Sequence, residues 1–360
     1  MKTDARFPLT RHVFTPHFTG GEDFSLSIYD GGFTPSMLRS AYDFDETITG
    51  RGIKIAIVSA LDNVGIKENM KVFCHAFSLP EAKMEVFYPF GRSGSTSSGW
   101  LTESSLDSQW AHVFAPESEL YVVFSRDADV KNMMECARFS SQELGADIVL
   151  LSFGSDESLV DKQLSLFFEE SQSVFVSSSG DVGSHVSFPS TNPFCISVGG
   201  TTLILDKRNY SRIDERAWQN SGGGASEIFP IQPWQGRFYD IYGLSNGFRA
   251  TPDVSMSADM KNGAYVYVSA LGGWTTVGGT SFAASCFAGV CALIKSRHSE
   301  IKNSADMLYY LYAKAGNVGY SVPQYYFNDI VTGNSGIYFA QPGWDFATGL
   351  GSAKIRQLLL

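Results

Sequence analysis

The chain has few charged residues, and positive charge is the scarcer sign. Asp, Glu, Lys and Arg make up 18% of the 360 residues, and 27 Lys and Arg stand against 37 Asp and Glu, for a formal net charge of −10. Lys and Arg form no basic stripe, so we expect no nucleic-acid partner. Hydrophobic residues make up 44% of the chain, which is enough for the core of one large domain.

Cysteine is also scarce. The five cysteines are an odd number, are widely spread and form no Cys-x-x-Cys pair. This spacing argues against a disulfide framework and against a cysteine-ligated metal site. Cys286 and Cys291 fall in the apolar stretch 282–294, where free thiols pack as small hydrophobic side chains.

Long hydrophobic runs are absent from the sequence. No segment reaches the length of a transmembrane helix, and residues 1–14 lack the apolar core of a signal peptide. We therefore expect no membrane association. The compartment stays open, because the chain as it stands would be cytoplasmic unless it is a mature fragment that carries an added Met.

Buried strands and helical segments alternate along the first half of the chain. This alternation is typical of an α/β fold with a parallel sheet and helices on both faces. We expect residues 1–32 to form an irregular N-terminal arm and residues 33–360 to form one domain, whose Gly-, Asn- and Ser-rich loops after residue 200 suit a binding cleft. The predicted strands are 52–58, 120–124, 148–152, 174–178 and 195–198, and the predicted helices are 35–42, 107–114, 130–144 and 160–172.

A serine stands where a glycine-rich turn runs into a buried helix. Gly278-Gly279-Thr280-Ser281 is followed directly by the apolar stretch 282–294. The free N–H groups and the dipole at the start of a helix stabilise negative charge, which suits a nucleophile. The alternative is that Thr280 or Ser281 only caps the helix, which is the commoner role for a Gly-Thr-Ser run taken alone.

Histidine, the usual base for a serine nucleophile, is scarce and unsuitably placed. The six histidines lie outside the glycine-rich turns, so the base must be another group. Glu103 and Asp107 are four residues apart and would project from one face of a helix. Acidic residues also favour the first turn of any helix, so the pair alone is a weak signal.

Asp181 follows the predicted strand 174–178 in the run Ser-Ser-Ser-Gly-Asp. This is the edge at which parallel sheets place ligands. Gly-Asp is a common turn, but a neutral Asp181 could also donate a hydrogen bond to an oxyanion.

Several short motifs around these residues occur in one order along the chain. They are Ser-Gly-Asp-Val-Gly at 179–183, Phe-Pro-Ser-Thr-Asn-Pro at 188–193, Val-Gly-Gly-Thr-Thr at 198–202, Pro-Asp-Val-Ser-Met-Ser-Ala-Asp at 252–259 and Gly-Thr-Ser at 279–281. Together they resemble the sedolisin, or serine-carboxyl peptidase, family over roughly residues 33–353. The resemblance implies a subtilisin-like, three-layer α/β fold with a central parallel sheet flanked by helices, and cleavage of peptide bonds at acidic pH.

The resemblance also implies a role for each candidate residue. Ser281 would be the nucleophile, Glu103 the general base and acid, Asp107 the partner that orients Glu103, and Asp181 the acid that stabilises the oxyanion. A carboxylate base works only near carboxyl pKa values, and Asp181 donates only while protonated, so both conditions point to acidic pH.

Further segments resemble the substrate-binding parts of the family. Ser152, Phe153 and Gly154 resemble the segment that pairs with an extended substrate, although Phe153 replaces a frequent tryptophan. The run 222–224, Gly-Gly-Gly, resembles a loop near the cleft, with a plain flexible loop as the alternative. Ser285 stands where the family usually has proline.

The C-terminal region resembles the calcium site of the family. One structural Ca²⁺ would be held by oxygen ligands, which this ion requires. The predicted ligands are the carboxylates of Asp329 and Asp345 and the backbone carbonyls of Ile330, Gln341 and Gly343.

From the resemblance we expect a monomeric serine endopeptidase that acts on peptides or unfolded proteins, with a pro-region that this chain lacks. The same resemblance leaves open a tripeptidyl-peptidase, and a catalytically silent binding protein of the same fold. A glycosidase in which Glu103 and Asp107 flank a sugar is a further alternative, but it gives Ser281 no role. An acidic compartment or secretion would suit the family.

Overall fold

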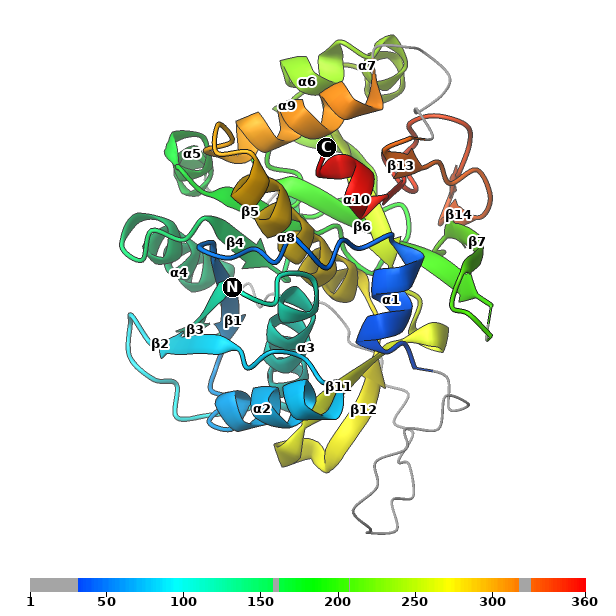
Figure 1. Cartoon of the computed structure of the whole chain (residues 1–360). Coiled ribbons are helices and arrows are strands. Elements are labelled where there is room, and N and C mark those ends of the chain that lie inside the picture. The colour runs from blue at the N-terminus through cyan, green and yellow to red at the C-terminus, as the bar shows by residue number, and fades with distance from the viewer. Residues whose placement is uncertain (1–31, 158–161, 207, 317–324) are drawn as a thin grey trace.

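The computed structural model describes residues 32–157, 162–206, 208–316 and 325–360. The arm predicted for residues 1–32 therefore lies almost wholly outside the described residues. Within them, the predicted α/β architecture is confirmed, because a large and mostly parallel sheet is covered by helices on both faces (Figure 1).

Ten strands of the described residues form the central sheet, in the order β13-β16-β10-β6-β5-β4-β1-β3-β2, with β7 paired to β6. The strands from β2 to β16 are parallel, whereas β13 and β7 pair antiparallel to their neighbours. Their bounds are β1 Lys54–Ala60, β2 Lys83–Phe87, β3 Glu119–Ser125, β4 Ile148–Leu151, β5 Val174–Ser178, β6 Ile196–Leu205, β7 Arg212–Ala217, β10 Val254–Ser257, β13 Phe327–Asn328 and β16 Ser352–Ala353.

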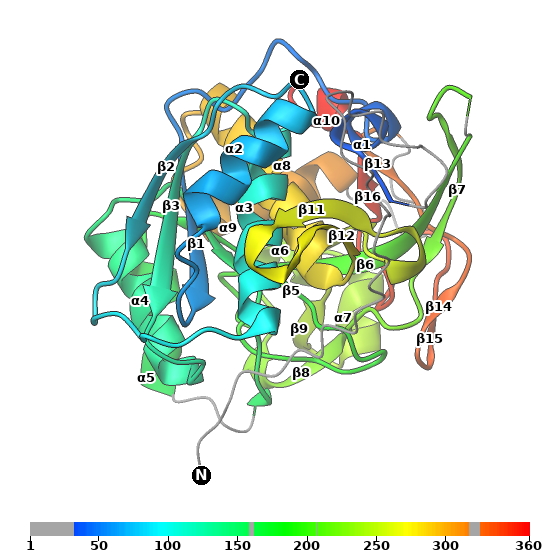
Figure 2. The ribbon, with the colours of Figure 1, turned by 90° about the horizontal axis from the view of Figure 1, so that it is seen from below.

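Strand β1 shows why the sheet is covered on both sides. Successive side chains of a strand point to opposite faces. Ile55 and Ile57 belong to the core under the helices α2, α3 and α8, whereas Ala56 and Val58 belong to a second core with α4 and α5. The view in Figure 2 places β1, β2 and β3 between these two sets of helices. The bounds are α2 Ile66–Ala76, α3 Ser98–Phe114, α4 Val130–Gln142, α5 Lys162–Glu170 and α8 Thr280–Arg297.

The remaining elements lie around this framework. Three two-stranded antiparallel sheets and five further α-helices are described. None of the helices in the described part of the chain is long and apolar enough to cross a bilayer. The bounds are α1 Pro35–Ala41, α6 Pro233–Gly236, α7 Tyr239–Ser245, α9 Ser304–Ala315, α10 Ile355–Leu358, β8 Gly224–Pro230, β9 Phe248–Thr251, β11 Ala264–Val268, β12 Gly273–Val277, β14 Asn334–Ser335 and β15 Tyr338–Phe339.

Helix α3 differs from its prediction. The sequence predicted a helix over 107–114, but α3 already begins at Ser98, where the Ser97 side chain accepts a hydrogen bond from the Trp100 N–H. Residues 101–114 of this helix are all buried, polar ones included. A helix that buries its whole circumference lacks the amphipathic pattern by which helices are recognised in a sequence.

Helices α3 and α8 pack together at very short range, and a glycine makes this possible. A Cβ atom built on Gly289 of α8 would lie 2.6 Å from the Phe114 Cβ atom and 2.8 Å from the Ala111 carbonyl oxygen of α3. Glu103 and Asp107 lie on α3, and Ser281 lies on α8. The spacing of the candidate site therefore depends on this contact.

We expect Gly289→Ala to lower the free energy of unfolding by about 1–3 kcal/mol, because the added methyl group pushes the two helices apart. An alanine in a helix otherwise stabilises by about 1 kcal/mol relative to glycine. Gly243 of α7 has no atom within 4 Å of such a Cβ, so Gly243→Ala serves as the matched control and should stabilise. Urea unfolding of both variants tests this, and a Gly289→Ala variant as stable as the wild type would contradict the tight contact.

Candidate active site

Ser281 lies in the first turn of α8 and is held by a glycine turn. Gly279 has φ +118° and is the N-cap residue of α8, with no side-chain cap, so neither Thr280 nor Ser281 serves as the cap. A residue with a side chain rarely adopts this conformation. Ser281 is only 3% exposed, and its hydroxyl lies close enough to the Glu103 carboxyl group to lower the pKa of that group.

Glu103 and Asp107 project from one face of α3 into the same buried space. They are 4% and 0% exposed. The Asp107 Oδ1 atom accepts hydrogen bonds from the Ser285 Oγ at 2.6 Å and from the Ser152 Oγ at 2.9 Å. The Asp107 Oδ2 and Glu103 Oε1 atoms are buried without a partner among the described residues. One proton shared between these two oxygens would satisfy both.

Burial is the main influence on the acidity of this pair. It raises the pKa of Glu103 well above its usual value, and the nearby charges of Asp107 and Asp181 raise it further, whereas the Ser281 hydroxyl lowers it. Burial also raises the pKa of Asp107 to about 7, against the lowering effect of the Ser285 and Ser152 hydroxyls. Two close buried carboxyl groups are more stable with one proton between them than with both groups ionised, so they titrate as a coupled pair.

Asp181 lies beside the start of α8, in the loop that follows β5. Its Oδ1 atom accepts hydrogen bonds from the Thr280 N–H at 2.7 Å and from the Thr280 hydroxyl at 2.8 Å. Burial raises the pKa of Asp181 to about 6, so the group is a neutral acid below that pH. A Cβ atom on Gly279 would lie 2.7 Å from the Asp181 Oδ2 atom, which therefore faces the glycine turn before Ser281.

The glycine run 222–224 packs tightly against the same loop. The Gly222 N–H donates to the Gly180 carbonyl at 2.7 Å. A Cβ atom on Gly222 would lie 2.2 Å from the Ser179 carbonyl oxygen, and one on Gly223 would lie 2.0 Å from the Phe346 carbonyl oxygen. Residues 222 and 223 are glycines because the backbone of another segment lies where their Cβ atoms would be. This close packing argues against the flexible-loop alternative.

The predicted substrate-binding segment divides into two parts. Ser152 lies directly after β4 and donates to Asp107. The Phe153 side chain is 1% exposed and belongs to the core around α4 and α5, so only the backbone of Phe153 and Gly154 is left for pairing with substrate. That pairing stays a prediction.

The histidines of the described residues have other partners or surroundings. His112 is buried, its Nε2 atom is 2.8 Å from the Pro80 carbonyl oxygen, and burial lowers its pKa to about 4. His298 contacts Glu300 and Tyr310. The titratable groups that the described residues place close to Ser281 are carboxyl groups.

The residues predicted to bind calcium share one loop. The Asp345 Oδ2 atom accepts from the Gln341 N–H at 2.9 Å, and the Asp329 Oδ2 atom accepts from the Gly343 N–H at 3.1 Å. The Asp329 Oδ1 atom is buried without a partner. Burial raises the pKa of both aspartates, that of Asp345 to about 7. Within the described residues, no three His, Cys, Asp or Glu side chains converge as a metal site, so calcium stays a prediction.

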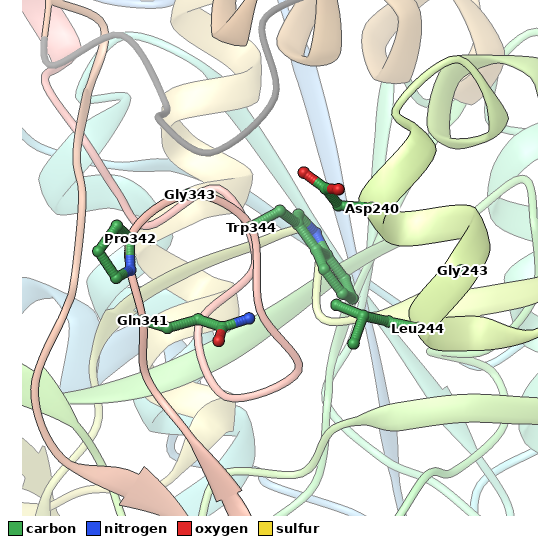
Figure 3. Close-up of a pocket in the computed structure, with 7 residues that line it drawn as sticks. All are labelled: Asp240, Gly243, Leu244, Gln341, Pro342, Gly343 and Trp344. Carbon is green, nitrogen blue, oxygen red and sulfur yellow. The ribbon is translucent and has the colours of Figure 1, made fainter.

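A pocket of about 560 Å³ lies beside this loop and shares no residue with the Ser281 group. Trp344 and Leu244 line it from the loop and from α7, with the Asp240 carboxylate close to Trp344 (Figure 3). The other lining residues are Gly243, Gln341, Pro342 and Gly343.

Two contacts of the site were missed at the sequence level. The Thr280 hydroxyl binds Asp181, and the Ser285 hydroxyl binds Asp107. The spacing of four residues places Ser285 on the same helix face as Ser281, but it gives no sign of the partner, because Asp107 comes from another helix.

Comparisons with known proteins agree with this geometry. The model of the Subtilase family matches residues 94–351. Kumamolisin from Bacillus sp. (strain MN-32) is 29% identical over 396 aligned positions, which cover 98% of this chain and 69% of kumamolisin. Sedolisin from Pseudomonas sp. (strain 101) is 32% identical over 48% of this chain and 30% of its own length. Tripeptidyl-peptidase 1 from Mus musculus is 25% identical over 91% of this chain and 64% of its own length.

The fold has a counterpart among solved structures. Pseudomonas sedolisin, a serine-carboxyl proteinase complexed with two molecules of pseudo-iodotyrostatin, superposes with a TM-score of 0.78. The superposition covers 91% of this chain and 97% of the other, at 23% identity. It shows that the central sheet with helices on both faces is the subtilisin-like fold.

Proposed function

Because this chain belongs to the sedolisin family, whose members hydrolyse peptide bonds with a serine nucleophile at acidic pH, we propose that it is an endopeptidase with Ser281 as nucleophile. The observation that carries the proposal is the buried group in which the Ser281 hydroxyl lies near Glu103 and lowers its pKa, while the Ser285 hydroxyl donates to Asp107, one helical turn from Glu103. Serine, base and orienting group are thus arranged as in other activated serine nucleophiles.

The first chemical step is attack on the substrate carbonyl. Glu103, as a carboxylate, takes the proton of the Ser281 hydroxyl while the oxygen attacks, and the Asp107 carboxyl group orients Glu103 through the shared proton. The resulting oxyanion accepts a hydrogen bond from the protonated Asp181. Glu103 then passes its proton to the leaving amine, and water hydrolyses the acyl-enzyme by the reverse sequence of proton transfers.

The pH range follows from these roles. The Glu103–Asp107 pair needs one negative charge to act as a base, which sets the acid limb of the activity profile. Asp181 needs its proton to donate to the oxyanion, and its pKa is raised to about 6. Activity should therefore peak in weak acid, where a fraction of the molecules has both a charged pair and a protonated Asp181, and it should fall at higher pH because an ionised Asp181 repels the oxyanion.

The relatives support two candidate modes of peptide-bond cleavage for this chain. Kumamolisin aligns over 98% of this chain, and this match, with the likeness to the serine-carboxyl proteinase sedolisin, supports the endopeptidase proposal. The match to tripeptidyl-peptidase 1 over 91% of the chain supports the second candidate, release of tripeptides from a free amino terminus. Peptide or unfolded protein substrates suit both, and a separate pro-region is a further partner that the family favours.

We also propose one structural calcium ion in the C-terminal loop. The unpartnered Asp329 Oδ1 atom and the buried carboxylate of Asp345 are hard oxygen donors of the kind that Ca²⁺ prefers. The carbonyls of Ile330, Gln341 and Gly343 would complete the set, and the ion would tie the loop together without taking part in the chemistry.

The calcium proposal predicts that a chelator lowers the melting temperature of the wild-type protein by several degrees, because an ion that binds only the folded state stabilises it. The Asp329→Asn variant should already have the lower melting temperature without chelator, and the chelator should change it little. Thermal unfolding with EDTA and with added Ca²⁺ measures both. Equal melting temperatures in EDTA and in Ca²⁺ would rule the ion out.

The peptidase proposal predicts cleavage of an internally quenched peptide with an acetylated amino terminus at pH 4–5. Ser281→Ala should lower kcat/KM at least about 10³-fold, because the nucleophile is lost. Ser140→Ala is the matched control, since Ser140 is a buried helical serine whose hydroxyl donates to the Cys136 carbonyl. Cleavage that requires a free amino terminus would favour the tripeptidyl-peptidase, and full activity of Ser281→Ala would contradict both candidates.

A further inference from the structure

Ser285 lies one helical turn after Ser281 and reaches the back of the candidate site. It is 0% exposed. Its Oγ atom lies 2.6 Å from the Asp107 Oδ1 atom and 2.7 Å from the Ser281 carbonyl oxygen. A single side chain thus connects the helix turn that carries the nucleophile to the carboxyl group behind the base.

From this geometry we infer that Ser285 is a positioning residue: it directs the Asp107 proton toward Glu103 and sets the pH at which the Glu103–Asp107 pair gains its working negative charge. The inference rests on the proposed function and adds to it a residue with no counterpart in the usual Ser-Glu-Asp-Asp set.

The first argument concerns the two oxygens of Asp107. Oδ1 accepts from the hydroxyls of both Ser285 and Ser152, and these donors occupy its lone pairs. Oδ2 is buried and has no hydrogen-bond partner. A proton on Asp107 therefore resides on Oδ2, the oxygen left for the Glu103 side of the pair.

The second argument concerns charge. The groups that face the pair are the Asp181 carboxyl group from the loop after β5, the Ser281 and Ser285 hydroxyls from α8 and the Ser152 hydroxyl after β4. The Asp181 carboxyl group opposes a negative charge on the Glu103–Asp107 pair, whereas the hydroxyl donors stabilise that charge. A hydrogen bond to a buried carboxylate favours its charged form.

The test is Ser285→Ala. Loss of one donor to Asp107 makes the charged pair less stable, so the acid limb of the kcat/KM profile should move to higher pH by about 0.5–1 unit. The alkaline limb, assigned to Asp181, should stay where it is. Ser140→Ala is again the matched control, because it removes the same bond to a preceding carbonyl, at 2.7 Å, without touching a carboxyl group.

A second measurement does not depend on turnover. With carboxyl-¹³C-labelled aspartate in the inactive Ser281→Ala protein, the Asp107 signal, assigned by its loss in Asp107→Asn, should titrate at higher pH once Ser285→Ala is added. If the wild type cleaves no peptide but this titration still shifts, the proposed function fails and the role of Ser285 stands.

The inference is overturned if neither the acid limb nor the Asp107 titration moves, even when Ser285→Ala lowers the melting temperature, because that result describes a purely structural side chain. If Ser285→Ala does not fold, Ser285→Cys keeps a side chain of similar size with a weaker donor. It should then shift both readouts in the same direction by a smaller amount, and an unshifted Cys variant overturns the inference equally.

Discussion

The structure depends on three carboxyl groups, the buried ones of Glu103 and Asp107 and the half-buried one of Asp181, where two helices and two strand ends meet. Removing a carboxylate from water is costly unless hydrogen bonds replace its hydration. Here the donors are serine and threonine hydroxyls and one backbone N–H group, with no cation among the bonded partners described. Neutral donors compensate burial only in part, so the pKa values rise into the range in which carboxyl groups exchange protons in weak acid.

The rest of the fold holds these groups at short range. Gly289 lets α3 and α8 approach, and Gly222 lets the glycine run lie against the Asp181 loop. The ends of β4 and β5 bring Ser152 and Asp181 to the same edge of the sheet, where parallel sheets usually bind ligands. Small residues at the contacts are thus part of the site, because any wider spacing would separate Ser281 from Glu103.

The sequence predicted several strands of the central sheet and a set of residues that the structure brings together, whose catalytic roles stay predictions. The strand predicted over 174–178 matches β5, and the structure brings Ser281, Glu103, Asp107 and Asp181 together. The N-terminal half of α3 was not predicted, because its buried polar residues hide the helical pattern. The substrate pairing of residues 152–154 stays a prediction, but the burial of the Phe153 side chain was not foreseen, since a one-dimensional pattern does not show which face a residue takes beyond the end of a strand.

The contacts of Ser285 and Thr280 could not be found from residue types alone. Serine and threonine are common near the start of a helix, and their hydroxyls become informative only when the carboxyl group that they bond is located. Spacing suggested a common face for Ser281 and Ser285, but Asp107 comes from another helix, and long-range contacts of this kind require the folded structure.

The most direct test of the central claim is to trap the acyl group during turnover. A peptide ester substrate is mixed with the enzyme at pH 4–5, quenched in strong acid within milliseconds, and the protein is digested and mapped by mass spectrometry. The account predicts an acyl group on the peptide that contains Ser281, and none when Glu103 is replaced by Gln. An acyl group on another residue, or turnover with no acylated Ser281 under conditions in which deacylation is slow, would contradict it.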